Sequence, residues 1–450
     1  MQKTFTWLVL LCVAAMAQEA KISVPYNSFV LPNGLHVILH EDHSTPTVSV
    51  NMWYHVGSSR EKPGRTGFAH LFEHILFEGS GHVAEGDFDN FLEAAGGNNN
   101  GSTTPDRTNY YETIPSNALD LALFLESDRM GYLLEAMSPA KVDGQRDVVK
   151  NERRQRYENT PYGLAFPTLG ENLYAPDHPY HWPTIGYMED LSAASYDDVA
   201  EFFKKYYAPN NASLVIAGDI DPAQTRAAVE KWFADVKRGA PVPPQATPSA
   251  YLAEEKRLIL EDRLQLPRLC MAWLTPQNFA PGDAELDLLS NVLAGGRNSR
   301  LYKRLVYDLQ IAQDVSAFQN SGRLSSSFII IATARSGHSL NELEKVIQEE
   351  IDKLKNEPPA ERELQRAVNQ YEASFLRRLE AVDAKADQLN NYFMLTGNPD
   401  YFNEDMARYK AVAPKDLRAV TFTFLRDDGR IILSIVPQGK KEMAATKSMD

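Results

Sequence analysis

The sequence predicts an α+β fold built from two homologous modules, each a β-sheet covered by helices. Two observations indicate this class. One set of strand and helix patterns occurs twice in the same order, and the helical patterns do not alternate strictly with the strands, as they would in a doubly wound parallel sheet. A chain of 450 residues is also too long for a single ordinary core.

Each copy of the repeat begins with two short apolar runs, which we expect to form paired strands. A helical pattern follows each pair, and a further apolar strand ends each copy. Equivalent positions in the two copies are separated by about 220 residues, which indicates a duplicated module. The first-copy patterns are 37–39, 48–53, 67–79 and 214–217, and their equivalents are 258–260, 269–273, the helical pattern that ends at Gly295-Gly296, and 432–435.

A proline-rich stretch separates the two copies. Four prolines lie within eight residues shortly after Gly239, which is typical of a stiff, extended linker. The sequence therefore predicts an N-terminal module over residues 18–238, a linker over 239–252 and a C-terminal module over 253–450.

Residues 1–17 have the pattern of a secretory signal peptide. Lys3 precedes an apolar run, and Ala15-Met16-Ala17 fits the small-residue rule for the cleavage site. This run is too short to remain as a membrane anchor, and no later apolar run reaches 18 residues. We therefore expect a periplasmic or secreted bacterial protein without a membrane span after cleavage. Its remaining cysteine, Cys270, has apolar neighbours and is expected to be a buried thiol.

The charge balance excludes one class of function. The chain has 46 Lys and Arg against 60 Asp and Glu, a formal net charge of −14. A general nucleic-acid-binding protein needs a basic face. We therefore expect no nucleic-acid partner.

The most specific local signal is His70-Leu71-Phe72-Glu73-His74. On a helix, His70 and His74 lie one turn apart on the same face, and Glu73 lies between them in angle. Two imidazoles are good Zn²⁺ ligands, and a carboxylate beside them can take a proton from water that the metal activates. The residues around the motif are largely apolar, so this helix is expected to be buried. Buried His and Glu side chains without partners would be unfavourable, and a metal removes that cost.

A catalytic zinc site usually has a third protein ligand. Glu152 is a candidate because it shares a helical face with Val148 and Val149, and a carboxylate that completes an apolar stripe is unusual on a surface helix. Position alone leaves Glu158 open as an alternative.

These motifs, with further segments in the same order, resemble the inverted-zincin peptidases of the pitrilysin family, which includes insulin-degrading enzyme and the mitochondrial processing peptidase. The resemblance covers most of the mature chain. It implies that His70, His74 and Glu152 bind Zn²⁺ and that Glu73 is the general base of a metallopeptidase. The matching segments are 31–35, 53–58, 67–80, 96–100, 151–152, 161–163, 178–180, 207–211 and 218–219.

The resemblance also implies an assembly and a substrate site. Family members of this length form one half of a clamshell, which closes around a chamber with a second subunit. The stretch 102–114 resembles the edge strand to which the substrate adds as an extra strand, and Asn100 is the expected substrate-binding side chain. In the second copy, Asp287, Ser290 and Asn291 take the places of the three motif residues, so that module looks like a duplicate without a metal site.

Two departures from the family pattern affect the expected role. Gln145 stands seven residues before Glu152, where the family often has a second carboxylate. Val306 and Gln313 stand where self-sufficient members have an Arg and a Tyr that hold the substrate near the zinc, and neither can replace those donors. We therefore expect the zinc-bearing subunit of a heterodimer whose homologous partner carries the Arg/Tyr pair, with a homodimer as the second choice.

The expected function is that of an exported zinc metalloendopeptidase, which hydrolyses peptides or unfolded polypeptide segments inside a closed chamber. The alternative is a non-catalytic structural or peptide-binding subunit of the same fold. The complete set of motif residues favours the enzyme.

Overall fold

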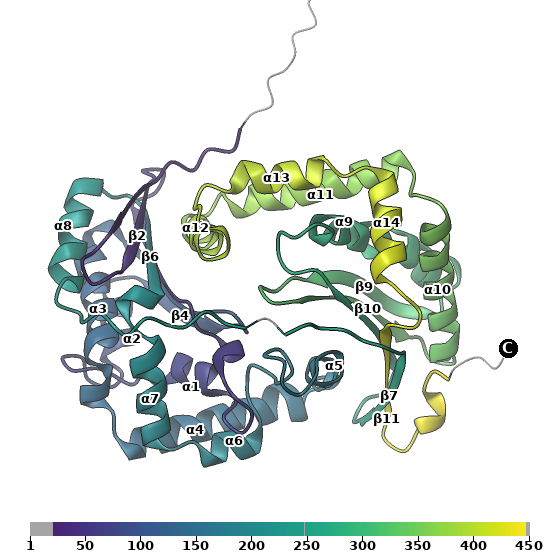
Figure 1. The fold of residues 1–450 in the computed structure, drawn as a ribbon, viewed down its shortest axis with the longest axis horizontal. Coiled ribbons are helices and arrows are strands. Elements are labelled where there is room, and N and C mark those ends of the chain that lie inside the picture. Colours follow the sequence, from purple (N-terminus) through teal and green to yellow (C-terminus); the bar gives the residue numbers. More distant parts are fainter. Residues whose placement is uncertain (1–20, 247, 447–450) are drawn as a thin grey trace, which may run out of the picture.

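The computed structural model describes residues 21–246 and 248–446, and its two modules face each other across the molecule (Figure 1). The predicted signal peptide, residues 1–17, lies outside the described residues. None of the described helices is both long and apolar enough to cross a membrane.

The N-terminal module is built on a sheet of six strands: β1 (Asn27–Val30), β2 (His36–Glu41), β3 (Thr47–Tyr54), β4 (Asn98–Thr103), β5 (Thr108–Pro115) and β6 (Ala212–Gly218). The strand order is β1-β2-β6-β3-β5-β4, in which β2 and β6 are parallel and all other neighbours are antiparallel. Its helices are α1 (Phe68–Ile75), α2 (Asp87–Ala94), α3 (Leu119–Ala136), α4 (Pro139–Arg153), α5 (Ala165–Leu173), α6 (Met188–Ala193), α7 (Tyr196–Tyr206) and α8 (Pro222–Phe233).

The C-terminal module is built on a sheet of five strands: β7 (Lys256–Asp262), β8 (Arg268–Thr275), β9 (Ala312–Asn320), β10 (Ser326–Ala334) and β11 (Arg430–Pro437). The strand order is β7-β11-β8-β10-β9, and β7 and β11 are parallel. Its helices are α9 (Asp283–Ala294), α10 (Leu340–Asn356), α11 (Glu361–Arg378), α12 (Val382–Thr396), α13 (Phe402–Lys410) and α14 (Pro414–Phe424).

The two sheets confirm the predicted α+β duplication. The order β2-β6-β3-β5-β4 in the first sheet matches β7-β11-β8-β10-β9 in the second, with the parallel pair at the same place. The described residues between Phe233 and Lys256 form no helix or strand. The linker bounds at residues 239–252 stay a prediction.

One pairing in the sequence analysis was wrong. The runs 37–39 and 48–53 lie on β2 and β3, which do not pair with each other because β6 lies between them. In the second module β11 separates β7 and β8 in the same way. All residues of β6 are buried. A strand this apolar is most stable with a neighbour on each side, so it occupies the interior of the sheet.

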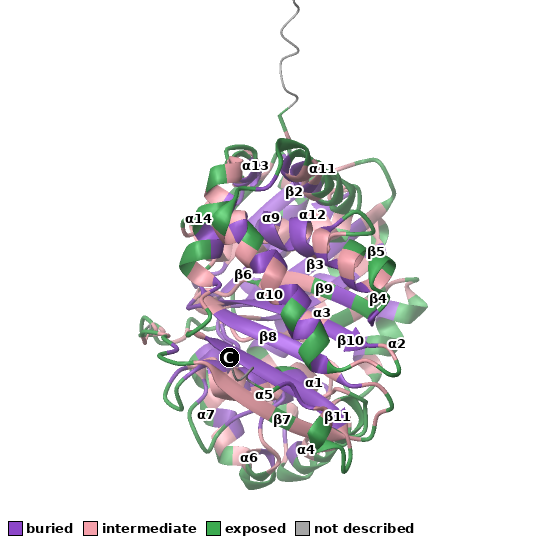
Figure 2. Ribbon diagram, turned by 90° about the vertical axis from the view of Figure 1, so that its right-hand side faces the viewer, coloured by how far each residue is buried: buried purple, intermediate pink, exposed green. Residues whose placement is uncertain are grey.

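Burial is concentrated in the strands and in the inner faces of the helices, whereas the outer helical faces are exposed (Figure 2). Each module has its own main core of buried apolar side chains. Cys270 on β8 is a buried free thiol, as predicted, and burial raises its pKa to about 12.

Each module also supplies one helix to the sheet of the other module (Figure 1). Helix α5 packs on β8 and β11, where Leu169 joins a cluster with Leu433. Helix α12 packs on β3 and β6, where Leu389 joins a cluster with Val215. This reciprocal packing buries apolar sheet surface that each module would otherwise expose, so it fixes how the modules sit against each other.

Candidate metal centre

Helix α1, which carries the motif, is held at its N-terminus by a buried carboxylate. The residue before the helix is Gly67, which has a left-handed backbone (φ 85°) and no side chain to cap the helix. Instead, the backbone N–H groups of Gly67 and Ala69 donate to Glu61 at 2.9 and 2.7 Å. Burial raises the pKa of Glu61 to about 8, and these bonds oppose that shift. Glu61 therefore satisfies N–H groups that would otherwise lack partners at the start of α1.

The apolar face of α1 is buried, as predicted. Leu71, Phe72 and Ile75 have no exposed surface, and the Phe72 carbonyl accepts a hydrogen bond from the Tyr110 hydroxyl at 3.0 Å. With one face of the helix fixed against the core, the orientation of the motif side chains on the other face is also fixed.

The two motif histidines and Glu152 come together in space. Nε2 of His70 lies 3.8 Å from Oε2 of Glu152, and Nε2 of His74 lies 3.1 Å from the same oxygen. The ligand atoms of these residues all lie within 4.8 Å of one another, and no other such group of three His, Cys, Asp or Glu side chains occurs in the described part of the chain.

The arrangement fits a Zn²⁺ ion. Nitrogen and oxygen ligands at tetrahedral zinc lie about 2.0–2.1 Å from the metal, so two of them are about 3.4 Å apart. The observed separations of 3.1 and 3.8 Å lie on either side of that value. The three side chains are 11%, 24% and 15% exposed, so the cluster is shielded without being sealed.

The charge states of these side chains also suit a metal. Burial lowers the pKa of His70 to about 4, so its imidazole is neutral at pH 7 and has a lone pair to offer. The hydrogen bond with His74 lowers the pKa of Glu152, which keeps this carboxylate ionised. Oε1 of Glu152 pairs with Arg156 at 2.7 Å, which leaves Oε2 turned toward the histidines.

The alternative ligand, Glu158, lies outside the cluster. Its side chain is 39% exposed and pairs with Arg153 at 3.3 Å. The helical-face argument for Glu152 was partly wrong: Val149 is fully buried, but Val148 is 45% exposed. Helix α4 is rotated so that only one of the two valines reaches the core.

Glu73 lies beside the cluster and is positioned by the strand β4. The Thr103 hydroxyl donates to Oε2 of Glu73 at 2.6 Å. The β4 backbone at Gly101 also lies close to Glu73: a Cβ atom added to Gly101 would lie only 3.1 Å from Cγ of Glu73. Burial raises the pKa of Glu73, and the Thr103 bond opposes the shift. Sequence reasoning missed Thr103, since nothing in the local pattern indicates a contact across 30 residues.

The predicted edge strand, residues 102–114, was wrong in its bounds. The edge strand is β4 (Asn98–Thr103), whereas β5 lies inside the sheet, paired with β3 and β4. The chain reverses between them in a turn, in which the Thr104 hydroxyl accepts hydrogen bonds from the N–H groups of Asp106 and Arg107. Asn100 lies on the true edge strand and is exposed.

Gln145 has a carboxylate as its neighbour. Its Nε2 donates to Oε1 of Glu78 at 2.5 Å, and Lys141 donates to the Glu78 carbonyl at 2.6 Å. Burial raises the pKa of Glu78, whereas the electrostatic interaction with His74 lowers it, so Glu78 lies close enough to His74 to influence it. A carboxylate is thus present near the ligands, although it comes from the segment after α1 rather than from α4.

In the second module, a tyrosine packs at the place equivalent to the metal cluster. Asp287, the counterpart of His70, accepts a hydrogen bond from Tyr409 at 2.7 Å, and the Tyr409 ring stacks on Tyr371 with centroids 3.6 Å apart. Burial raises the pKa of Asp287 to about 7. Val306 is half-buried in the π-helical segment Tyr302–Asp308, between α9 and β9, and Gln313 is exposed on β9.

Comparison with known families places the chain. Residues 36–178 match the family described as Insulinase (Peptidase family M16), and residues 193–371 match the Peptidase M16 inactive domain. The chain belongs to the M16 peptidase family. This confirms the resemblance seen in the sequence. The second match begins within the N-terminal module, before β6, and continues into α11 of the C-terminal module.

Relatives that match most of this chain are named as peptidases or peptidase subunits. The zinc protease PqqE of Helicobacter pylori is 28% identical over 404 residues, which cover 87% of this chain and 90% of the relative. A probable mitochondrial-processing peptidase subunit beta of Arabidopsis thaliana is 23% identical over 422 residues, covering 90% and 77%. A crystal structure of a protease from Helicobacter pylori has a TM-score of 0.84 at 26% identity and covers 92% of this chain and 100% of the other.

Proposed function

We propose that this M16 protein is a zinc metalloendopeptidase in which His70, His74 and Glu152 hold Zn²⁺ and Glu73 is the general base. The observation that carries the proposal is the convergence of three ligand atoms beside a positioned carboxylate. When bound, Zn²⁺ supplies Lewis-acid chemistry: it polarises a peptide carbonyl and lowers the pKa of water. The name of the Helicobacter pylori relative, a zinc protease, supports the same reading.

The residues of the chain move the proton. Glu73 accepts a proton from the attacking water and then passes it to the amine that leaves. The Thr103 hydroxyl holds one oxygen of Glu73, so the other oxygen is available for this exchange. Burial raises the pKa of Glu73, which makes its ionised carboxylate a stronger base. Only this ionised form can accept the proton from water.

The edge strand β4 is the proposed substrate platform. It pairs only with β5 among the described residues, so its other edge can bind the backbone of an extended peptide. Asn100 is exposed on this strand and can add a side-chain hydrogen bond to the peptide. Backbone pairing needs an extended chain, which favours peptides and unfolded segments over folded proteins.

We propose further that the protein is exported and works as one subunit of a heterodimer. The signal-peptide pattern supports a periplasmic or secreted location. Two features support a partner: Val306 and Gln313 lack the donors that would hold the substrate, and the Arabidopsis thaliana relative is named a subunit. The partner would be a homologous chain that carries the Arg/Tyr pair. A homodimer is the second choice, and a non-catalytic subunit is less favoured because the ligand set is complete.

A zinc titration tests the ligand set. Glu152→Ala should weaken zinc binding strongly because it removes one of three ligands, whereas Glu158→Ala should leave it nearly intact. Both changes remove a glutamate from the same stretch, so Glu158→Ala is a matched control. The opposite pattern would reassign the third ligand.

A mixing experiment tests the assembly. Peptide cleavage and mass in solution should be measured for this chain alone and with a homologous chain that carries the Arg/Tyr pair. We expect weak cleavage by the isolated chain and a clear gain in the mixture, together with the mass of a heterodimer. Full turnover by a homodimer that no partner improves would contradict the proposal.

A further inference from the structure

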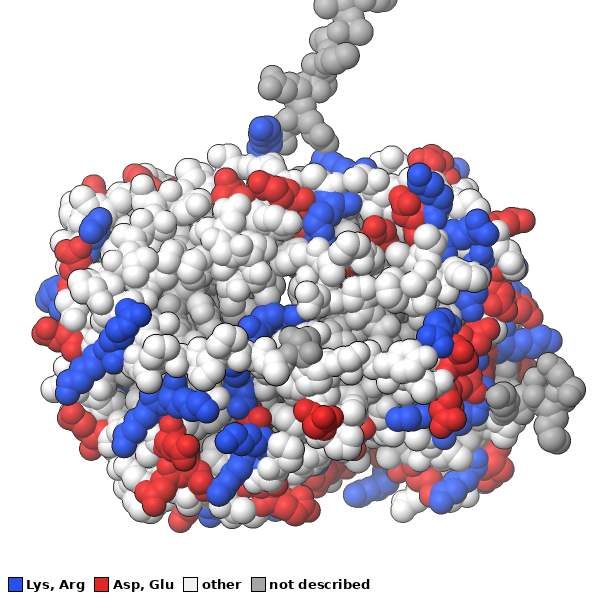
Figure 3. Space-filling model, viewed as in Figure 1, with Lys and Arg blue, Asp and Glu red and all other residues white. Residues whose placement is uncertain are grey.

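A cavity of about 610 Å³ lies at the seam between the two modules. On the face shown in Figure 3, the surface is hollowed where the modules meet. One wall comes from the β4–β5 turn, α5 and residues 174–184 of the N-terminal module, and the other from α12 and the β9–β10 turn of the C-terminal module. The volume is in the range of about 300–1,000 Å³ that is typical of ligand pockets, which often lie at domain interfaces.

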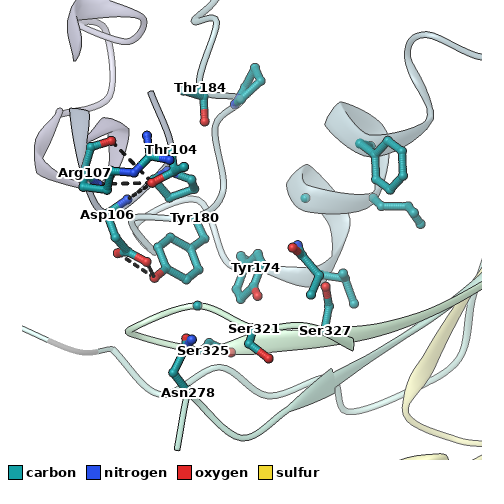
Figure 4. Close-up of a pocket in the computed structure, with 18 of the residues that line it drawn as sticks. Thr104, Asp106, Arg107, Tyr174, Tyr180, Thr184, Asn278, Ser321, Ser325 and Ser327 are labelled. Atoms are coloured by element: carbon teal, nitrogen blue, oxygen red, sulfur yellow. Dashed lines mark hydrogen bonds between the residues drawn. The ribbon is translucent and has the colours of Figure 1, made fainter. Parts of the chain in front are cut away.

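The cavity walls are rich in aromatic rings and are balanced in charge. Two cations and two anions line the space: Arg107, Arg378, Asp106 and Asp387. The C-terminal side adds small hydroxyl groups, among them those of Ser321, Ser325 and Ser327 (Figure 4). An uncharged aromatic group fits such a wall better than an ion does. The rings belong to Trp53, Tyr157, Phe166, Tyr174, Tyr180 and Trp182.

Arg107 is a charged group of the cavity whose guanidinium keeps donors that no described residue uses. Its Nη1 donates to the carbonyl and hydroxyl oxygens of Ser102 at 2.9 and 2.7 Å, and its guanidinium lies 5.0 Å from the centroid of the Trp53 ring. No described residue forms a hydrogen bond or ion pair with its Nε or Nη2. The opposite holds for Asp106, whose carboxylate accepts from the Tyr180 hydroxyl at 2.7 Å (Figure 4). Arg107 can therefore donate to an occupant or stack on its ring.

The cavity is within reach of a peptide bound at the catalytic site. Gly101 on β4 contacts Glu73, and the cavity wall begins at Thr104, three residues further along the chain. At about 3.3 Å per residue, a peptide paired with β4 covers this distance of about 10 Å in three residues. A side chain about three residues from the cleaved bond would thus lie at the seam.

We propose that the seam cavity is a specificity pocket, which binds an aromatic side chain of the substrate about three residues from the cleaved bond. The inference rests on the proposed peptidase function, since it takes Glu73 as the point of cleavage. It assigns to both modules of one chain a joint role in choosing the substrate, through α5 and α12.

The test uses cavity-filling variants from opposite walls. Gly170 of α5 lines the cavity, and a Cβ added to it would lie 3.5 Å from its nearest neighbour, the Tyr180 carbonyl oxygen, so Gly170→Leu is the variant that fills the space from this wall. Asn391→Trp fills the cavity from α12, and it keeps the test valid if the first variant fails to fold. Gly144→Leu is the matched control, because Gly144 is an exposed helical glycine of α4 with no atom near its Cβ position.

Binding is measured first, on the Glu73→Gln chain, by fluorescence anisotropy with peptides that carry one Tyr, Phe, Ala, Glu or Lys at successive positions. We expect the aromatic peptides to bind about 10-fold or more tightly than the alanine peptide at one position. Gly170→Leu or Asn391→Trp should reduce this ratio to near one, and Gly144→Leu should preserve it. The same ratios are then measured as kcat/KM on the active protein.

The outcomes separate the two proposals. Equal binding of aromatic and alanine peptides at every position, or an aromatic preference that survives both filling variants, would overturn the specificity pocket while leaving the peptidase in place. An aromatic preference in binding that the filling variants abolish, without cleavage of any peptide by the native protein either alone or mixed with the homologous partner chain, would support the pocket and contradict the peptidase.

Discussion

Replacing Glu61 with alanine should destabilise the helix that carries the metal ligands. The side chain is only 7% exposed, and it accepts the backbone N–H groups of Gly67 and Ala69. In Glu61→Ala both donors lose their acceptor in a region that water does not reach easily. His70 is the third residue of α1, so the disturbance falls directly on a proposed ligand.

The size of the effect follows from these two bonds. A buried N–H group left without a partner costs about 1–3 kcal/mol, so two of them cost about 2–6 kcal/mol. That is a large fraction of the roughly 5–15 kcal/mol that stabilises a typical domain. Helix α1 has eight residues, whereas an isolated helix needs about 12–15 to be even marginally stable. The helix therefore depends on Glu61 and on its packing.

Urea unfolding and zinc competition with a chelator measure the two consequences. Glu61→Gln keeps an acceptor oxygen and should lose less stability than Glu61→Ala. Glu93 is an exposed glutamate on α2, so Glu93→Ala should change neither the stability nor the zinc affinity. We expect Glu61→Ala to weaken both folding and zinc affinity. If the free energy of unfolding of Glu61→Ala lay within about 0.5 kcal/mol of that of the native protein, and the variant bound zinc equally well, the role assigned to Glu61 would be refuted.

Two further predictions concern side chains that link separate segments. Glu78→Gln should weaken zinc affinity by about 10-fold. Adding Gln145→Glu moves the carboxylate to the other side of the Gln145–Glu78 hydrogen bond and should restore the affinity. A double variant that binds zinc as weakly as Glu78→Gln would contradict the role of Glu78. The hydrogen bond from Lys385 on α12, at 2.5 Å, holds the pKa of Asp42 well below its ordinary value of 3.8, so this pair stabilises the fold above pH 4 and loses its effect as the pH falls further. Lys385→Met should therefore cost about 1.5–3 kcal/mol in urea unfolding at pH 7, with a gap from the native protein that narrows below pH 4; a gap independent of pH would count against the pair.

Local periodicity made part of the site predictable. The spacing of His70 and His74 puts both on one helical face, and the apolar residues around them indicate burial, so these features could be read without a structure. The repeat likewise predicted two modules with the same element order. In each case the signal lies within a few residues or recurs along the chain.

Contacts between distant segments were not predictable in this way. The insertion of β6 between β2 and β3 joins strands more than 150 residues apart, and no local pattern specifies such a pairing. The exposure of Val148 depends on how far α4 is rotated when it packs, which the spacing of two adjacent valines does not determine. Thr103 acts through one hydrogen bond to a side chain, and Glu61 acts through two hydrogen bonds from backbone N–H groups. A polar residue in a loop or strand gives no sign of such bonds.

The most direct test of the proposed chemistry is one preparation of Glu73→Gln assayed for both zinc content and peptide cleavage. Glu73 lies beside the ligand cluster without belonging to it, so the variant should retain zinc at the native level. Its turnover should fall by about 10²–10⁴-fold, since glutamine cannot accept the proton from water. Retained zinc with unchanged cleavage would remove Glu73 from the mechanism and contradict the central claim.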